Sequence, residues 1–153
     1  MKAFRANYAD INPLAKLCQR LHQTSSWKEL EFNMTLVRKN LMEVVREPGM
    51  DVLAVKDDEG NYTGILLATV EQFFICKELY ATDIHFMCEK GGIQLFAEFR
   101  RWAKEHNAKK IVMGIANDDP EGKVHAFYKM VGMRQVGDAW VYDLQDETKE
   151  QAA

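Results

Sequence analysis

Apolar residues in the first third of the chain recur every three or four positions, which is the spacing of a helix with one buried face. The first such run, 11–22, follows a short predicted edge strand at Lys2–Asn7. Asn12 followed by Pro13 is typical of a helix start, so we expect Asn12 to be the N-cap. A second run, 34–47, predicts another helix that ends before a Pro-Gly pair.

Shorter apolar runs bounded by polar turns follow, and these are typical of strands. Val52–Val55 and Tyr62–Val70 lie on either side of Asp57–Asn61, a turn by composition, so they predict an antiparallel hairpin. Leu79–Cys88 is a third predicted strand, rich in aromatic and β-branched residues. The later predicted elements are a helix (Ile93–His106), a strand (Lys110–Ala116), a helix ending at Val131, and a hairpin of Met133–Val136 with Ala139–Leu144 around a turn at Gly137-Asp138.

The predicted order of elements is β-α-α-β-β-β-α-β-α-β-β. It begins with antiparallel strands and contains a β-α-β crossover, which joins parallel strands of one sheet. We therefore expect an α/β fold with a mixed (α+β) sheet flanked by helices. The 153 residues are enough for a single domain, predicted at 1–144, followed by a polar C-terminal tail at 145–153.

Charge and composition argue against several classes of partner. The net charge is −3 and the isoelectric point about 5.8, so we expect no general attraction to nucleic acid or to anionic membranes. No apolar run reaches the ~20 residues that span a bilayer, and the first residues do not resemble a signal peptide. The three cysteines are widely spaced and match neither a disulfide framework nor a metal site. These features predict a cytoplasmic protein with reduced thiols and no metal.

A glycine pair at a predicted strand-to-helix turn is the first candidate site. Gly91 and Gly92 precede the helix that starts at Ile93. Such a turn offers an anion the backbone N–H groups and the dipole of the helix, and Lys90 adds a cation. The alternative is a plain connection into the helix.

Three stretches carry a more specific signal. The first runs from Asp83 through Gly91-Gly92 into the following helix, and the second is the strand Lys109–Asn117, which ends in asparagine. The third, Ala126–Met133, is similar to an FY-x-x-x-GF helix ending. Together with the element order, they resemble the GNAT (Gcn5-related N-acetyltransferase) superfamily over nearly the whole chain. The short length and the form of the loop are similar to bacteriophage-encoded members.

The resemblance implies acetyl-CoA as the cofactor and no metal. The family's cofactor loop usually carries an arginine or a glutamine before its glycines, whereas the loop of this chain has no arginine and is shorter. A lysine cannot copy the bidentate phosphate contact of an arginine. The residues that the resemblance assigns to the cofactor are Cys88, Lys90, Gly91, Gly92, Ile93 and Asn117.

The resemblance also points to candidate catalytic residues. Tyr128 matches the tyrosine that protonates the leaving coenzyme A thiolate, and the alternative is a buried aromatic that closes the last helix. Asp83 and His85 are two residues apart in a strand, so we expect both on one face beside the acyl group, where either could accept the proton of the amine directly or through water. The alternative is that one faces solvent and the other is a core group with its hydrogen bonds satisfied. His85 has the better pKa for this role, and His125 is a weaker candidate. Trp27 lies in a connection that borders the acceptor site in the family, although a contact between the first two helices is an equal alternative.

The sequence thus predicts an acetyl-CoA-dependent N-acetyltransferase that works by direct transfer in a ternary complex. Backbone N–H groups of the strand Asp83–Cys88 would polarise the thioester carbonyl. The alternative is a catalytically degenerate GNAT-fold protein that binds a macromolecular partner. The expected acceptor is a small-molecule or peptide amine whose identity is open, as is a homodimer. The expected location is the cytoplasm, or the host cytoplasm for a phage-encoded protein.

Overall fold

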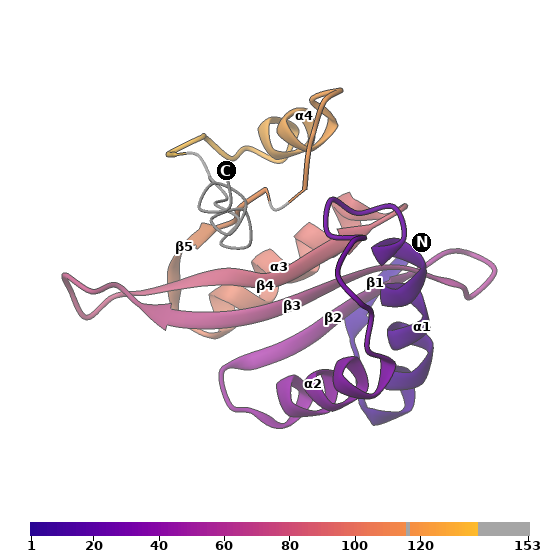
Figure 1. Ribbon diagram of the computed structural model, residues 1–153. Coiled ribbons are helices and arrows are strands. Elements are labelled where there is room, and N and C mark those ends of the chain that lie inside the picture. The colour runs from indigo at the N-terminus through magenta and orange to yellow at the C-terminus, as the bar shows by residue number, and fades with distance from the viewer. Residues whose placement is uncertain (116, 138–153) are drawn as a thin grey trace, which may run out of the picture. The chain divides into compact units, whose positions relative to one another are not determined.

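The structure, a computed structural model, describes residues 1–115 and 117–137 (Figure 1). The chain divides into two compact units, Met1–Met113 and Gly114–Ala153. The first unit contains the whole described sheet and three α-helices, and the second contains one described α-helix. Within the described ranges, no helix has both the length and the apolar character that a membrane crossing requires.

Five strands of the first unit form one sheet, in which they follow one another in chain order. Neighbouring strands are antiparallel except for the last pair, which is parallel. This mixed sheet confirms the predicted fold class, and the predicted element order is confirmed through the last described helix. The strands are β1 (Lys2–Arg5), β2 (Met50–Lys56), β3 (Tyr62–Gln72), β4 (Leu79–Cys88) and β5 (Ala108–Val112).

Helices cover both faces of this sheet (Figure 1). α1 (Ile11–His22) and α2 (Met34–Arg46) pack on one face, and α3 (Gly92–Glu105) lies on the other. Because both faces are covered, the middle of β2 is a continuous apolar run instead of an alternating one: Val52–Val55 is at most 1% exposed. Val52 belongs to the core under α1 and α2, and the alternation of a strand directs its neighbour to the opposite face.

The start of α1 differs from the prediction. Asn7, not Asn12, caps the chain here: its side chain accepts a hydrogen bond from the backbone N–H of Ala9, and its own N–H donates to Asp10 Oδ2 at 2.9 Å. This capping box closes a short 3-10 turn, Tyr8–Asp10, that leads directly into the helix. The predicted N-cap is wrong because that turn already starts the helix, which leaves Asn12 inside the first helical turn.

Strand β4 is irregular in the middle and changes neighbours along its length. Its pairing with β3 shifts by one residue, and Ile84 is the extra residue of this β-bulge. Its parallel pairing with β5 covers only Leu79–Thr82. Past Thr82, no strand of the described chain pairs with that side of β4. Among the described strands, the second half of β4 therefore has only β3 as a neighbour.

Strand β5 begins two residues earlier and ends four residues earlier than predicted. The prediction was Lys110–Ala116, but the strand covers Ala108–Val112. Asn107 has a left-handed backbone with φ 58°, which asparagine tolerates better than most residues. This residue turns the chain from the end of α3 straight into the sheet, so the strand begins at once.

The second unit contains α4 (Lys123–Met130). This agrees with the helix predicted to end at Val131. Residues 133–137 have no regular secondary structure, so the first strand of the predicted hairpin is not formed there. The second predicted strand, Ala139–Leu144, and the predicted tail at 145–153 lie outside the described residues.

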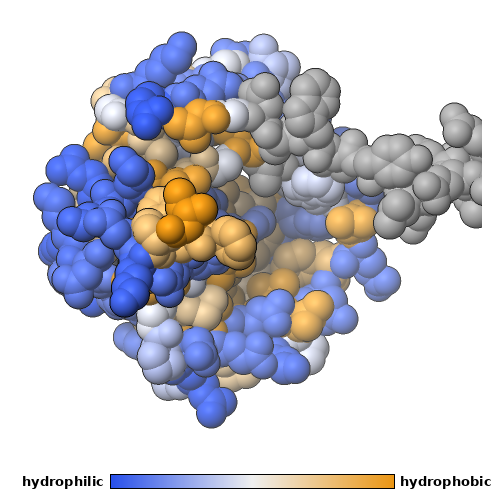
Figure 2. All heavy atoms as spheres, turned by 90° about the vertical axis from the view of Figure 1, so that its left-hand side faces the viewer, coloured by the Kyte–Doolittle hydropathy of each residue, from blue (hydrophilic) through white to orange (hydrophobic). Residues whose placement is uncertain are grey.

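The β3–β4 hairpin carries large apolar side chains at its tip. Phe74 is 104% exposed and Ile75 is 88% exposed. Figure 2, which faces this tip, shows a hydrophobic patch surrounded by hydrophilic surface. The turn itself is ordered by backbone hydrogen bonds, from Phe73 N–H to the Glu78 carbonyl and from Cys76 N–H to the Phe73 carbonyl. The hairpin therefore holds two apolar side chains in solvent in a defined position.

Candidate active site

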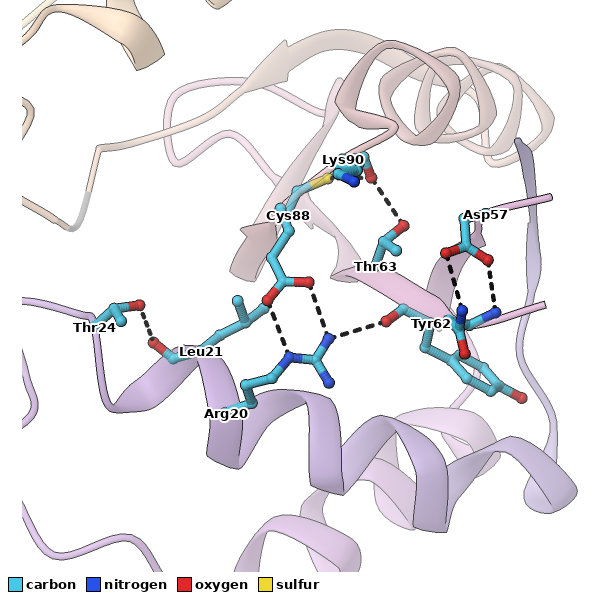
Figure 3. A network of polar contacts seen from close by, with 10 residues as sticks. Arg20, Leu21, Thr24, Asp57, Tyr62, Thr63, Cys88 and Lys90 are labelled. Carbon is cyan, nitrogen blue, oxygen red and sulfur yellow. Dashed lines mark hydrogen bonds and ion pairs between the residues drawn. The ribbon is translucent and has the colours of Figure 1, made fainter. Parts of the chain in front are cut away.

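A three-residue loop, Glu89–Gly91, joins the end of β4 to the start of α3. Its backbone is tied to the neighbouring strand (Figure 3): the Lys90 carbonyl accepts hydrogen bonds from Thr63 Oγ1 and from Cys88 Sγ, each at 3.0 Å. The Glu89 N–H donates to the Thr63 carbonyl at 2.8 Å. The path of the loop is therefore fixed by hydrogen bonds to its backbone groups.

Gly91 is the one position of this loop that requires glycine. Its φ is +85°, in the left-handed region, and a Cβ atom there would lie 2.8 Å from Val55 Cγ2. Gly91 is also the N-cap of α3, and as a glycine it has no side chain that could cap the helix. The first backbone N–H groups of an α-helix have no partner within the helix and carry the positive end of its dipole. The loop therefore presents a helix end suited to an anion.

Arg20 on α1 reaches this loop from a distant part of the sequence (Figure 3). Its Nε donates to Glu89 Oε1 at 3.0 Å and its Nη2 donates to Glu89 Oε2 at 2.9 Å, so the pair is bidentate. Nη2 also donates to the Tyr62 carbonyl at 3.2 Å. The hydrogen bond with Arg20 is the main cause that lowers the pKa of Glu89, so this carboxylate is ionised at neutral pH.

Cys88 lies beside the loop as a thiol, not as a thiolate. Burial raises the pKa of its thiol to about 11, while a smaller effect of the Lys90 backbone acts in the opposite direction. Only the thiolate is a good nucleophile. Cys88 is therefore a hydrogen-bond donor that supports the loop backbone.

The expectation that Asp83 and His85 share one face of the sheet is wrong. His85 pairs with Leu67, and Asp83 pairs with Ala68. Directly paired residues point to the same face, whereas successive residues such as Leu67 and Ala68 point to opposite faces. Because the bulge at Ile84 inserts one residue, the two candidate bases lie on opposite faces of β4.

His85 lies on the face that α1 and α2 cover, because its partner Leu67 packs against their core. Burial lowers the pKa of His85, and His22 at the end of α1 lowers it further. The side chain still has an exposed surface. It is therefore a neutral imidazole at pH 7 that solvent or a substrate can reach, which is the state that a general base needs.

The connection between α1 and α2 begins next to His22 and contains Trp27. This tryptophan is half-buried in a hydrogen-bonded turn. Its N–H donates to Ser25 Oγ at 3.2 Å, and its carbonyl accepts from the Leu30 N–H at 3.0 Å. The connection thus has a defined backbone on the same side of the sheet as His85.

Tyr128 and Asn117 belong to the second unit. The Tyr128 hydroxyl donates to the Gly114 carbonyl at 2.8 Å, and both predicted residues are half-buried. The Tyr128 hydroxyl donates its proton to a carbonyl oxygen here. It must break this hydrogen bond before it can donate to another group. A hydroxyl bonded to the backbone agrees with the alternative interpretation of Tyr128, an aromatic side chain that closes the last helix.

His125, the weaker candidate, forms a pair with Asp119 within the second unit. The distance from His125 Nδ1 to Asp119 Oδ2 is 2.7 Å, and the same oxygen accepts the backbone N–H groups of Val124 and His125. Burial raises the pKa of Asp119, but these hydrogen bonds outweigh burial and bring it to about 2. Asp119 therefore orients the imidazole and caps the start of α4 at the same time.

Two residues of the loop region were missed by sequence reasoning. Thr63 is buried within an apolar strand, and a buried hydroxyl needs a partner, so its position in the run was a usable signal. Arg20 gave no signal, because its partner Glu89 lies 69 residues away. The search for metal ligands across the described ranges found no group of three or more His, Cys, Asp or Glu side chains that could hold a metal ion.

No protein-family model matches the sequence, and no curated protein matches it. Several solved structures match its fold. A tetramutant of the BH1408 protein from Bacillus halodurans aligns with a TM-score of 0.74 and 18% identity, covering 94% of this chain and 100% of that chain. A ribosomal-protein-alanine N-acetyltransferase from Brucella melitensis biovar Abortus 2308 aligns with a TM-score of 0.69 and 13% identity, covering 94% and 100%.

The aminoglycoside 6'-N-acetyltransferase AAC(6')-IG from Acinetobacter haemolyticus aligns with a TM-score of 0.70 and 13% identity, covering 94% of this chain and 97% of that chain. At such identities the likeness shows the fold and not the activity. The alignments cover nearly all of each chain, and the mixed sheet with its β4–α3 connection agrees with the architecture predicted from the sequence. The chain therefore has the fold of the GNAT acetyltransferases.

Proposed function

We propose that the protein is an N-acetyltransferase that transfers the acetyl group of acetyl-CoA directly to an amine. The observation that carries this proposal is the β4–α3 loop, in which the N-cap residue Gly91 has a left-handed backbone and no side chain to cap the start of α3. The names of two proteins with the same fold, a ribosomal-protein-alanine and an aminoglycoside N-acetyltransferase, support the same chemistry.

The loop suits the diphosphate of coenzyme A. The N–H groups of Gly92 and Ile93 at the start of α3 would bind phosphate oxygens, and Lys90 would add a positive charge. A Cβ at Gly91 would collide with the buried Val55, so the loop lies close against β2. Thr63 and Cys88 hold the loop in place through the Lys90 carbonyl.

The second half of β4 would bind the remainder of the cofactor. Acetyl-CoA, when bound, supplies an acetyl group activated as a thioester. Parallel pairing with β5 ends at Thr82, so within residues 1–115 and 117–137 β4 offers a backbone edge along which an extended ligand could form hydrogen bonds. Backbone N–H groups of this edge, next to the bulge at Ile84, would stabilise negative charge on the carbonyl oxygen.

Two side chains would move the protons. An amine attacks only after it loses its proton, and the neutral imidazole of His85 would accept that proton. Tyr128 would hold at Oη the proton that the leaving thiolate requires, with Asn117 as a further cofactor contact. The connection that contains Trp27 would border the small-molecule or peptide amine, since it lies on the same side of the sheet as His85.

A thermal-shift titration with acetyl-CoA tests the proposal. A ligand at a hundred times its dissociation constant adds about 2.7 kcal/mol of stability. For a chain of this length that corresponds to a rise of about 5–10 °C in melting temperature. Gly92→Asp should abolish the rise, because it places a carboxylate at the first residue of α3, where negative charge is good for the helix but repels phosphate.

Gly92→Asn is the matched control, since it adds a side chain of the same shape without the charge. It should keep at least half of the rise in melting temperature. An unchanged melting temperature of the wild-type protein at millimolar acetyl-CoA would contradict the proposal.

A second candidate function has one observation in its favour. Phe74 and Ile75 are held in solvent by an ordered turn, and exposed apolar side chains of this kind are typical of protein–protein contacts. The protein would then keep the fold, lack catalysis and bind a macromolecular partner through the β3–β4 tip. The same titration separates the two candidates, because only the acetyltransferase requires acetyl-CoA to bind.

A further inference from the structure

The proposed cofactor loop carries an unfavourable charge. Glu89 is ionised, because its pKa is lowered. Lys90 is the only cation of the loop, and its charge also acts on Asp57 in the turn between β2 and β3, whose pKa is lowered chiefly by hydrogen bonds from Asn61 and to a smaller degree by Lys90. Two carboxylates thus interact electrostatically with one lysine. Within the loop, the charge of Glu89 thus offsets that of Lys90 and weakens the attraction of the loop for a diphosphate.

Arg20 supplies the missing positive charge from another element. Its guanidinium meets the Glu89 carboxylate in a bidentate geometry and is also fixed by the Tyr62 carbonyl (Figure 3). A bidentate pair of this kind fixes the position of both groups as well as their charge. Arg20 therefore neutralises Glu89 and holds its carboxylate toward α1.

The shape of the loop does not depend on Arg20. Thr63 and Cys88 bind the Lys90 carbonyl, Thr63 also accepts the Glu89 N–H, and Gly91 packs against Val55. The Arg20 side chain is 54% exposed and that of Glu89 is 37% exposed, so solvent screens their attraction and the pair adds little to folding. Because Arg20 contributes little to folding, we assign it an electrostatic role toward a ligand bound at the loop.

We propose that Arg20 is a positioning residue of the coenzyme A site: by pairing with Glu89, it allows the Lys90-Gly91 loop to bind a diphosphate. Arg20 lies on α1 and not in the loop, and its positive charge offsets the negative charge of Glu89. This inference rests on the proposed function.

Calorimetric titration with coenzyme A measures the effect directly. Arg20→Gln leaves the Glu89 carboxylate uncompensated, so the dissociation constant should rise roughly five- to thirtyfold. The rise should shrink at high salt, because the interaction is between exposed charges. Lys16→Gln is the matched control, since Lys16 is exposed one turn earlier on the same helix, and it should change the dissociation constant less than twofold.

Removal of Glu89 tests whether Arg20 acts through it. Glu89→Gln should bind coenzyme A at least as tightly as the wild type. The double variant R20Q/E89Q should return to within threefold of the wild type, since the repelling carboxylate is gone. A double variant as weak as Arg20→Gln would overturn the proposal, because Arg20 would then contact the ligand itself or support the fold.

A structural role is checked on the protein without ligand. The melting temperature of Arg20→Gln should stay within about 3 °C of the wild type, as expected for an exposed pair. If wild-type protein binds coenzyme A and Arg20→Gln binds it equally well, this inference alone fails. If the wild type does not bind coenzyme A, the proposed function fails and this inference with it.

Discussion

Substitution of Gly91 by alanine would show how tightly the cofactor loop is built. A residue other than glycine at φ +85° costs about 1–2 kcal/mol in backbone strain. The new Cβ would also lie 2.8 Å from Val55 Cγ2, and Val55 is fully buried in a central strand, so it cannot move aside freely. Overpacking of this kind costs typically 1–3 kcal/mol. Gly91→Ala should therefore lower the free energy of unfolding by about 2–5 kcal/mol.

Urea denaturation measures this change, and Gly60 provides the matched control. Its φ is +87°, nearly that of Gly91, but a Cβ there would meet nothing within 4 Å. Gly60→Ala should therefore cost only the backbone strain, about 1–2 kcal/mol. The difference between the two variants isolates the contact with Val55.

A double-mutant cycle with Val55→Ala completes the test. The smaller side chain removes the collision, so Val55→Ala should be less destabilising in the Gly91→Ala background than in the wild type, by about 1–3 kcal/mol. Equal costs at Gly91 and Gly60, together with no coupling to Val55, would refute the reasoning that the loop is pressed against β2.

Three further outcomes are expected. Tyr128→Phe should lower turnover at least tenfold and leave coenzyme A affinity within a few-fold, since general acid catalysis contributes typically 10²–10⁴-fold; unchanged turnover would mean that Tyr128 is structural. The general base must be neutral to act, and the pKa of His85 is lowered, so kcat/KM should fall only as the pH drops below the ordinary histidine value of about 6.5. His85→Gln should remove this fall of kcat/KM at acidic pH. Phe74→Ser should leave the melting temperature within about 2 °C, because a side chain that is 104% exposed loses no burial, and a larger drop would show that the tip is packed.

Much of the fold was predictable because its helices are amphipathic and its strands are apolar runs bounded by polar turns. β4 was predicted with its observed bounds, Leu79–Cys88, and α3 within one residue at each end. The start of α1 was not, because Asn7 and Asn12 both precede apolar residues, and only the 3-10 turn decides which one caps. Local patterns thus predict where an element lies better than how its ends are closed.

The candidate site was predictable only in part, because contacts made across the sheet leave no local pattern. The Gly91-Gly92 turn was visible as a strand-to-helix connection with glycines. The bulge at Ile84 was not visible, and it reverses the face of one of the two candidate bases. The pairing of Arg20 with Glu89 joins residues that are far apart along the chain.

The sequence by itself determined the order of strands and helices, the position of the glycine turn and the absence of an arginine from it. These follow from hydrophobic period and residue type, which act over a few neighbouring residues. The tertiary structure decided that His85 and Asp83 lie on opposite faces, that Gly91 is pressed against Val55, and that Arg20 compensates Glu89. The physical reason is that strand register and side-chain contacts between elements are fixed only when the sheet and its helices pack together.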